Sequence, residues 1–387
     1  MSAVALAPEA SRRRVLLVLT EVMSHGGIQR FNRTLLTALD ELGASVVALS
    51  LNDTDGVVTD SPFSERVTVL GFGRSKVRFA AGVARQLAAE RFDVLFIGHI
   101  HFATLMAAAH CLPRAKRAPR VMLIAHGQEV WESIRGGTRR ALGDVTDVVS
   151  VSAFTQERIL AQAPELGARR LHVFPNALAA SWIQWADQGS ALQDPSEIYG
   201  RYFLSVTRIS VSERTKGLVA ALEAFATLTD RSVHYVVAGS GDDVTFLRWV
   251  TQQLGVEERV HFRGSVSDLE LVSLYRKSAG FVLPSGQEGF GIVFLEAMYF
   301  GIPVLAAAEK GANDVVSDGV TGLTVPFGDV IGLARSMTRF LEDETLCQRL
   351  VANGRALVTG DGPFTFAAFR QRTAALIDVP DPVRASP

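Results

Sequence analysis

Two carboxylates and a group of glycines follow one apolar stretch in the second half of the chain. The stretch Gly280–Leu283 leads into a loop, 284–292, that contains Glu288 and three glycines, and Glu296 lies on the second turn of the helix predicted next. Glycines at a helix start let a phosphate approach the free backbone amides. A carboxylate accepts two hydrogen bonds from vicinal sugar hydroxyls. The pattern predicts a ligand with sugar, phosphate and sugar in line; the alternative is two solvated surface carboxylates.

Two cations follow another apolar stretch, Tyr202–Val206. Arg208 lies just after it, and Lys216 precedes a predicted helix that starts near Gly217. Open α/β sheets bind ligands at the carboxyl ends of their strands. Arg208 and Lys216 could therefore neutralise a diphosphate leaving group. The alternative is a pair of ordinary solvated cations, as we expect for Arg214 between them.

A pair of glycines follows the first predicted strand, Val15–Thr20. The segment 24–28 reads Ser-His-Gly-Gly-Ile, and an apolar helix face begins behind it. Gly26 and Gly27 would let a phosphate reach the helix N-terminus. The segment lacks the Lys-Ser/Thr of a P-loop and the third glycine of a dinucleotide fingerprint. A plain tight turn is the alternative.

Three histidines end two further predicted strands of the first half. His126 follows Val121–Ala125, while His99 and His101 follow Val94–Ile97. Each could contact a sugar hydroxyl or move a proton near neutral pH, and each could equally be structural. We expect no metal cluster, because no cysteine joins them and an extended strand would direct His99 and His101 to opposite faces.

Two other motifs suggest rival chemistry. Asp53-Thr54-Asp55 matches the DxD pattern of metal-dependent transferases, but it lies in a polar loop after a single strand. Gly239-Ser240-Gly241 follows a strand as in NAD-dependent oxidoreductases, but Val244 stands where the third glycine would be. Chelator sensitivity would favour the first reading and NAD binding the second.

Short β-branched apolar stretches alternate with helical patterns along the whole chain. This alternation predicts buried parallel sheets covered by helices on both faces, and twelve strands are too many for one ordinary sheet. The expected fold is therefore α/β, with two Rossmann-like doubly wound domains. The expected strands are Val15–Thr20, Ser45–Leu51, Val67–Leu70, Val94–Ile97, Val121–Ala125, Val148–Val151, His172–Phe174, Tyr202–Val206, His234–Ala238, Val260–Phe262, Gly280–Leu283 and Pro303–Ala306.

The domain boundary is expected within the polar, aperiodic segment 177–201. We predict an N-terminal domain over 1–185 and a C-terminal domain over 186–363. The last helical segment and tail, 364–387, are predicted to return to the first domain.

Composition narrows the functional classes. The chain has 387 residues, 48% of them hydrophobic, and a net charge of -1, which argues against a disordered or dedicated DNA-binding protein. Two cysteines cannot make a disulfide framework, and no signal peptide or membrane span is expected. We therefore expect a cytoplasmic protein. Charge is unevenly distributed along the chain. Up to Trp182 there are 21 Lys and Arg and 16 Asp and Glu, whereas the rest of the chain has 18 Lys and Arg and 24 Asp and Glu.

The basic first half carries two clusters, Arg74-Lys76-Arg78-Arg85 and Arg114-Lys116-Arg117-Arg120. A solvated surface is the plain interpretation of these clusters. The alternative is attraction to anionic membrane lipid.

Several motifs occur together and in a fixed order along the second half. They are Arg208…Lys216-Gly217, Ala238–Asp242, Phe262–Ser267, Glu288…Glu296, Gly301–Val304 and Asp318–Gly322. This succession resembles the retaining glycosyltransferases of family 4, whose signature is Glu-x7-Glu. The likeness is dense over 203–329 and thinner in the first half. It implies the GT-B fold, in which two Rossmann-like domains face each other across a cleft.

The resemblance also implies roles for individual residues. Arg208 and Lys216 would contact the donor diphosphate, Glu296 the ribose hydroxyls, and Gly264 and Val266 the edge of the nucleobase. The donor sugar and distal phosphate would be held by Glu288 and the backbone amides of Gly289, Phe290, Gly291 and Ile292. Gly26 and Gly27 would cover the diphosphate, and His126 would lie near the donor sugar and the acceptor. The resemblance thus implies a catalytic group of His126, Glu288, Arg208 and Lys216.

The implied reaction is retaining, metal-independent hexosyl transfer from a UDP- or GDP-sugar to an acceptor hydroxyl, with no cofactor. Front-face attack, in which the departing phosphate takes the acceptor's proton, is preferred over Glu288 as a nucleophile. The expected acceptor is a lipid-linked saccharide of exopolysaccharide, lipopolysaccharide or cell-envelope glycan synthesis, at the cytoplasmic face of the inner membrane. A soluble small-molecule acceptor and a non-catalytic nucleotide-sugar-binding relative remain alternatives. A nucleotide-sugar epimerase shares the fold but has other motifs.

Overall fold

The structure is a computed structural model of the chain. It describes residues 13–24, 26–105, 119–188, 194–308 and 311–378. The chain divides into two compact units, Met1–Ala177 with Phe366–Pro387 and Leu178–Thr365. The chain crosses from the first unit to the second between Ala177 and Leu178. The predicted domain boundary at 185/186 instead falls inside helix α6 (Ala180–Gln188).

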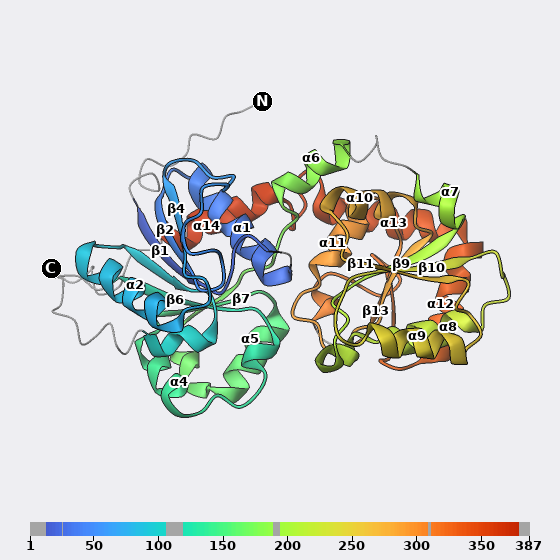
Figure 1. The fold of residues 1–387 in the computed structure, drawn as a ribbon, viewed down its shortest axis with the longest axis horizontal. Helices are drawn as coiled ribbons and strands as arrows, with labels where there is room; N and C mark the ends of the chain where they lie inside the picture. The colour runs from blue at the N-terminus through green and yellow to red at the C-terminus, as the bar shows by residue number, and fades with distance from the viewer. Residues whose placement is uncertain (1–12, 25, 106–118, 189–193, 309–310, 379–387) are drawn as a thin grey trace. The chain divides into compact units, whose positions relative to one another are not determined.

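The described part of the first unit contains a sheet in the order β3-β4-β2-β1-β5-β6-β7-β8 (Figure 1). All neighbouring strands are parallel apart from the short pair β3·β4. The strands are β1 Arg14–Leu19, β2 Ser45–Ser50, β3 Gly56–Val57, β4 Val67–Gly71, β5 Val94–Ile97, β6 Arg120–Ala125, β7 Asp147–Ser150 and β8 Arg170–Val173.

Helices of the first unit cover the sheet with amphipathic faces. Helix α1 buries Phe31, Leu35, Leu36 and Leu39, as the apolar spacing predicts. The helices are α1 Gly27–Glu41, α2 Lys76–Ala89, α4 Gly136–Ala141, α5 Ala153–Gln162 and α14 Phe366–Asp378, with 3₁₀ turns at Ile100–Phe102, Gln128–Val130, Leu142–Asp144 and Pro164–Ala168.

The C-terminal helix α14 lies beside α1 in this unit (Figure 1). Phe369 of α14 packs edge-on against Phe31 and Phe174, with ring centroids 5.8 and 4.8 Å apart. The Arg120 guanidinium donates to the Leu376 carbonyl at 2.6 Å. Apolar packing and this buried hydrogen bond thus attach the last helix to the first sheet.

The described part of the second unit contains a fully parallel sheet in the order β11-β10-β9-β12-β13-β14. Its strands are β9 Tyr202–Val206, β10 His234–Ala238, β11 Val260–Gly264, β12 Gly280–Leu283, β13 Val304–Ala307 and β14 Leu323–Val325. Its helices are α6 Ala180–Gln188, α7 Pro195–Tyr199, α8 Leu218–Ala226, α9 Val244–Gln253, α10 Asp268–Lys277, α11 Ile292–Tyr299, α12 Val330–Glu342 and α13 Glu344–Val358, with 3₁₀ turns at Val211–Lys216 and Ala312–Asp314.

The predicted fold class is confirmed: both units are doubly wound α/β structures, and each contains a buried apolar cluster. Among the parallel strands the order reverses at β1/β5 in the first sheet and at β9/β12 in the second. Ligands of open α/β sheets bind at such switch points, outside the carboxyl ends of the strands. This places the segments after β1, β5, β9 and β12 where binding residues are expected.

Candidate active site

Arg208, Lys216 and the glycine loop meet at the switch point of the second sheet. Arg208 and the turn Val211–Lys216 follow β9, and the loop 284–291 follows β12, the neighbouring strand. The two loops are joined directly, because the Gly286 amide donates to the Thr215 carbonyl at 2.8 Å. The sheet order therefore brings together residues that lie about 70 positions apart in the chain.

A glycine makes this close approach of the two loops sterically feasible. Gly217 has a φ of +76°, and a Cβ placed on it would lie 2.1 Å from the Pro284 carbonyl oxygen. Only glycine avoids both the left-handed strain and this clash. The predicted helix start at Gly217 is thus also the contact between the two loops.

Lys216 and Glu288 form an ion pair across this contact. Lys216 Nζ lies 2.9 Å from Glu288 Oε2, and the side chains are only 16% and 14% exposed. Just after Glu288, Gly291 has a φ of +85° and caps the N-terminus of α11. Because α11 follows β12, its free amides lie at the same edge of the sheet. Cation, carboxylate and helix N-terminus are therefore neighbours.

The other two cations of this segment differ in their roles. Arg208 is 63% exposed and lies 3.0 Å from Glu213 Oε1, a contact that water screens strongly. Arg214 instead makes two 2.7 Å hydrogen bonds to the largely buried Asp243 carboxylate and stacks over the Phe246 ring. Arg214, expected to be a plain surface residue, fixes the 3₁₀ turn to α9.

Glu296 is only 2% exposed, so the alternative of a solvated surface carboxylate does not apply to it. The Tyr275 hydroxyl donates to Glu296 Oε2 at 3.0 Å. Sequence reasoning missed Tyr275, because a tyrosine on the apolar face of a helix looks like any other core residue. Its role follows only from the packing of α10 against α11.

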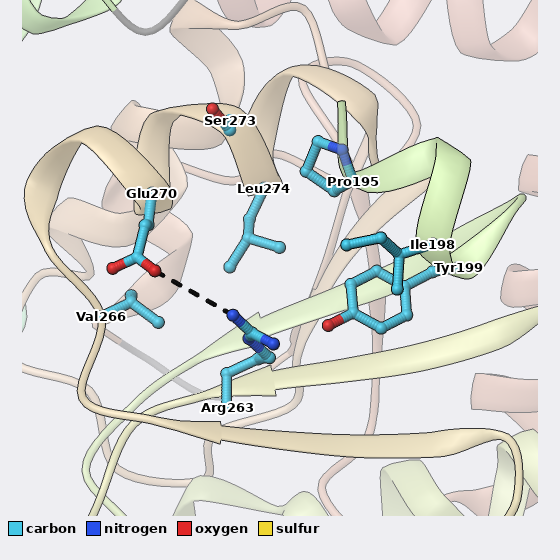
Figure 2. Close-up of a pocket in the computed structure, with 8 residues that line it drawn as sticks. All are labelled: Pro195, Ile198, Tyr199, Arg263, Val266, Glu270, Ser273 and Leu274. Carbon is cyan, nitrogen blue, oxygen red and sulfur yellow. Dashed lines mark ion pairs between the residues drawn. The ribbon is translucent and has the colours of Figure 1, made fainter. Parts of the chain in front are cut away.

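Gly264 and Val266 lie at the end of the edge strand β11. Gly264 has a φ of +68° and accepts a 2.8 Å hydrogen bond from the Gly239 amide, which joins the loops after β10 and β11. Val266 lines one end of a cavity of about 230 Å³ between α7, β11 and α10 (Figure 2). Within it, Arg263 lies 4.0 Å from Glu270. The cavity walls are Pro195, Ile198, Tyr199, Arg263, Val266, Glu270, Ser273 and Leu274.

The remaining residues of the glycine loop are largely buried. Phe290 is 2% exposed and packs edge-on against Phe364, with ring centroids 5.5 Å apart. Ile292 opens α11, and Gly289 lies in the loop before it. Their backbone amides, rather than their side chains, are the groups that the predicted donor contact requires.

In the first unit, Gly26 and Gly27 lie where β1 leads into α1. Gly26 is the N-cap residue of α1 with a φ of +150°, and Gly27 is the first helical residue. His25 lies outside the described residues. The helix N-terminus is thus at the carboxyl edge of the first sheet, beside its switch point.

Asp53 holds the segment that precedes these glycines. Its carboxylate accepts hydrogen bonds from the amides of Val22 and Met23, at 2.8 and 3.1 Å, and from the Ser50 hydroxyl at 2.6 Å. Asp55 is exposed and pairs with Arg78. In the DxD triplet, the buried Asp53 thus holds a loop through hydrogen bonds, and Asp55 forms an ion pair on the surface. Among the described residues, no group of three or more His, Cys, Asp and Glu side chains is placed to hold a metal ion.

His126 lies beside α1, with the Glu129 carboxylate close to its backbone. Its Nε2 is 3.1 Å from the Gly98 carbonyl, its ring meets Phe31 edge-on at 5.0 Å, and Glu129 accepts from its backbone amide. Burial lowers the pKa of His126, although Glu129 opposes the shift. The imidazole is therefore neutral at physiological pH, suited to hydrogen bonding rather than to charge pairing.

His99 lies near His126 and is also neutral. Burial lowers its pKa to about 4, with Glu129 opposing and His101 and His126 adding to the shift. The expectation that His99 and His101 point to opposite faces is wrong. The chain turns into a 3₁₀ helix at Ile100, and the two rings lie 4.6 Å apart.

The two basic clusters of the first half differ in the structure. On α2, Lys76 and Arg85 are exposed, and Arg78 pairs with Asp55. Arg114, Lys116 and Arg117 lie outside the described residues. Arg120 is only 4% exposed and forms a buried ion pair with Asp147, so its inclusion in a lipid-facing cluster is wrong. No helix among the described residues is long and apolar enough to span a membrane.

Two family models match the chain, one over each half. Residues 25–181 match "Glycosyltransferase Family 4", and residues 199–357 match "Glycosyl transferases group 1". The chain is 31% identical to a GDP-mannose-dependent alpha-(1-6)-phosphatidylinositol monomannoside mannosyltransferase of Mycobacterium tuberculosis, over 67% of this chain and 71% of that protein. It is 32% identical to an alpha-D-kanosaminyltransferase of Streptomyces kanamyceticus, over 50% of each.

Solved structures share the fold over nearly the whole chain. HepE of Anabaena, solved with UDP and glucose, has a TM-score of 0.71 and 18% identity, and the match covers 94% of this chain and 99% of HepE. Sucrose-phosphate synthase of Thermosynechococcus elongatus has a TM-score of 0.76 and 19% identity, covering 94% and 98%. At such identities the likeness establishes the architecture alone.

Proposed function

The chain belongs to glycosyltransferase family 4 and is a glycosyltransferase of the GT-B type, and on that premise we propose that it transfers a hexose with retention of configuration. The donor is a UDP- or GDP-sugar, and the nucleophile is an acceptor hydroxyl. The observation that carries the proposal is the meeting of Lys216, Glu288 and the N-terminus of α11 at the β9/β12 switch point. This arrangement suits an anion joined to a hydroxyl-rich group.

Within this proposal, Arg208, Lys216 and the amides of α11 stabilise the departing diphosphate. Their contribution grows as the bond to the anomeric carbon breaks, because the leaving group gains negative charge. They supply the charge stabilisation that a metal ion would otherwise provide, so we expect transfer to proceed without metal. Gly26 and Gly27 would add backbone amides, and Gly264 and Val266 would border the nucleobase.

The proposed chemistry is front-face attack. The acceptor oxygen bonds to the anomeric carbon as the carbon–phosphate oxygen bond breaks, and the departing phosphate oxygen takes the hydroxyl proton. The ion pair with Lys216 supports a role for Glu288 in holding the donor rather than as a nucleophile. The neutral His126 suits a hydrogen bond to a sugar hydroxyl.

For the acceptor we propose a lipid-linked saccharide at the cytoplasmic face of the inner membrane. The name of the tubercular relative includes phosphatidylinositol monomannoside, a lipid-linked saccharide. Helix α2 presents exposed Lys76 and Arg85, and Val77 between them is 81% exposed. Basic and apolar side chains on one surface helix suit anionic lipid. Vesicle co-sedimentation tests this: equal binding to anionic and neutral vesicles would leave a soluble acceptor as the better proposal.

A thermal-shift panel tests the donor. UDP, GDP, their common sugars and NAD are added with and without a chelator. A ligand that binds only the folded state raises its stability by about 2.7 kcal/mol at about 100 times its Kd. We expect a chelator-insensitive shift with one nucleoside diphosphate, and a loss of that shift in Glu296→Ala. NMR of the product's anomeric proton then reports retention or inversion. A shift without turnover on any acceptor would favour a non-catalytic nucleotide-sugar-binding protein.

A further inference from the structure

The buried carboxylate of Glu296 is oriented by a neighbouring hydroxyl. Tyr275 Oη lies 3.0 Å from Glu296 Oε2 and 3.4 Å from the Val293 carbonyl, so the carboxylate is its closer acceptor. Glu296 is 2% exposed and Tyr275 is completely buried. A hydrogen bond to a charged acceptor in such surroundings is stronger than one in water.

The ring that carries this hydroxyl is itself fixed on several sides. Phe300 stacks on Tyr275 with centroids 5.9 Å apart, and Trp182 and Phe281 meet it at 6.1 and 5.7 Å. Phe300 is the C-cap residue of α11, Trp182 lies on α6 and Phe281 on β12, whereas Tyr275 belongs to α10. The aromatic cluster therefore leaves the Tyr275 hydroxyl little freedom relative to α11.

We infer that Tyr275 is a positioning residue that sets how Glu296 accepts the ribose hydroxyls of the donor. The inference rests on the proposed function, which assigns the ribose to Glu296. A vicinal diol needs a carboxylate whose oxygens point in a defined direction, and a tyrosine hydroxyl anchored by packed rings fixes one of those oxygens. Tyr275 thereby increases the preference of the site for ribose over deoxyribose without contacting the substrate.

The test compares a nucleoside diphosphate with its 2′-deoxy form. Dissociation constants for UDP, 2′-deoxy-UDP, GDP and 2′-deoxy-GDP are measured by calorimetry with wild type, Tyr275→Phe and Tyr202→Phe. Tyr202 is the matched control, because it is equally buried and its hydroxyl donates to the Leu274 carbonyl on the same helix at 2.8 Å. Both variants remove one buried hydroxyl and keep the ring.

We expect Tyr275→Phe to weaken binding of the ribonucleotide about tenfold and to leave the deoxyribonucleotide nearly unchanged, so that the preference for ribose is lost. Tyr202→Phe should lower the unfolding temperature while keeping that preference. A merely structural role for Tyr275 predicts the behaviour of Tyr202→Phe, and that result would overturn the inference.

Two further variants keep the test decisive. Phe300→Leu removes the stacked ring but keeps the hydroxyl, so it should reduce the ribose preference partially even if Tyr275→Phe does not fold. An unchanged preference in Phe300→Leu would contradict the inference. Glu296→Ala separates it from the proposed function. If wild type and Glu296→Ala bind both nucleotides equally, the assignment of ribose to Glu296 fails. If only Glu296→Ala loses the preference, the role of Tyr275 fails.

Discussion

Lys216 and Glu288 lie 72 positions apart in the chain, yet Lys216 Nζ and Glu288 Oε2 are 2.9 Å apart at the switch point of the second sheet. Each charge is mostly withdrawn from water, so removal of one leaves the other poorly compensated. The ion pair therefore fixes the relative positions of the two loops that would bind the donor, before any ligand is present.

Replacement of Lys216 should impair both folding and the reaction, because it leaves Glu288 without its cation and removes a charge from the donor site. We expect Lys216→Met to lower kcat/KM for the nucleotide-sugar about 10²-fold or more, because a cation that stabilises the leaving diphosphate is lost. Steady-state kinetics and the nucleotide-dependent thermal shift measure this. Arg214→Met is the control: its guanidinium serves Asp243, so stability should fall while nucleotide affinity changes little. Equal losses of affinity in both variants would contradict the distinction.

The contact between the two loops depends on the missing side chain of Gly217. Gly217→Ala adds a left-handed strain of about 1–2 kcal/mol and places a Cβ 2.1 Å from a backbone oxygen, so the loops must separate. We expect loss of the nucleotide-dependent thermal shift together with a lower unfolding temperature. Gly255→Ala is the matched control, since Gly255 has a φ of +63° but no atom within 4 Å of its added Cβ. It should be destabilised by the strain alone and still bind nucleotide.

Substitution of asparagine should impair the protein at Asp53 and have no effect at Asp55, the two aspartates of the DxD triplet. Asp53→Asn leaves a buried carboxamide before the amides of Val22 and Met23, which we expect to cost about 1–3 kcal/mol and to lower activity by loosening the turn before Gly26. Asp55→Asn, two residues away and exposed, should leave urea unfolding and kcat/KM unchanged. Activity that needs an added divalent ion and is lost in both variants would instead favour a metal site.

A buried charge network gives the first unit a pH-dependent stability. Burial opposes ionisation of Asp147, but hydrogen bonds from Arg120, His172 and Thr146 outweigh it and hold the pKa of Asp147 well below its usual range. In the unfolded chain the pKa of an aspartate is about 3.9. The stabilisation from Asp147 is therefore complete well above that pH and is lost as the pH falls below it.

Asp147→Asn should therefore destabilise the protein by about 3–5 kcal/mol near neutral pH, since it leaves Arg120 buried without its partner. The difference from wild type should shrink as the pH is lowered to about 3.5, because the Asp147 carboxyl of the unfolded chain is then largely protonated while that of the folded protein stays ionised. Urea unfolding at both pH values measures this. Glu165→Gln, which breaks an exposed pair with Arg139, should have little effect at either pH. A difference that stays constant with pH would contradict the role given to Asp147.

Strands were predictable because a buried parallel strand must be apolar along its length. All twelve expected strands are present, and Val94–Ile97, Tyr202–Val206, His234–Ala238 and Gly280–Leu283 have their predicted bounds. Within the described parts of the chain, two further strands are present that were not predicted. β3 has two residues at a sheet edge and β14 has three, and such short segments carry too little pattern to stand out from a loop.

The candidate site was predictable only as a set of positions along the chain. Arg208, Lys216, Glu288 and Glu296 carry recognisable spacing, and the rule for carboxyl edges assigned them to one side of a sheet. No local signal distinguished Lys216 from Arg214, Asp53 from Asp55 or Arg120 from its basic neighbours. In each pair the chemistry is alike, and the difference lies in which distant group the side chain meets.

The α/β class, the strands and the family motifs could be predicted from the amino-acid sequence, because hydrophobic period and residue spacing are local properties of the chain. The pairing of Lys216 with Glu288, the hydrogen bond from Tyr275 to Glu296 and the burial of Arg120 against Asp147 became evident from the three-dimensional fold. These contacts depend on strand order and helix packing. Strand order is set by the burial of the whole core, which no short stretch of sequence encodes.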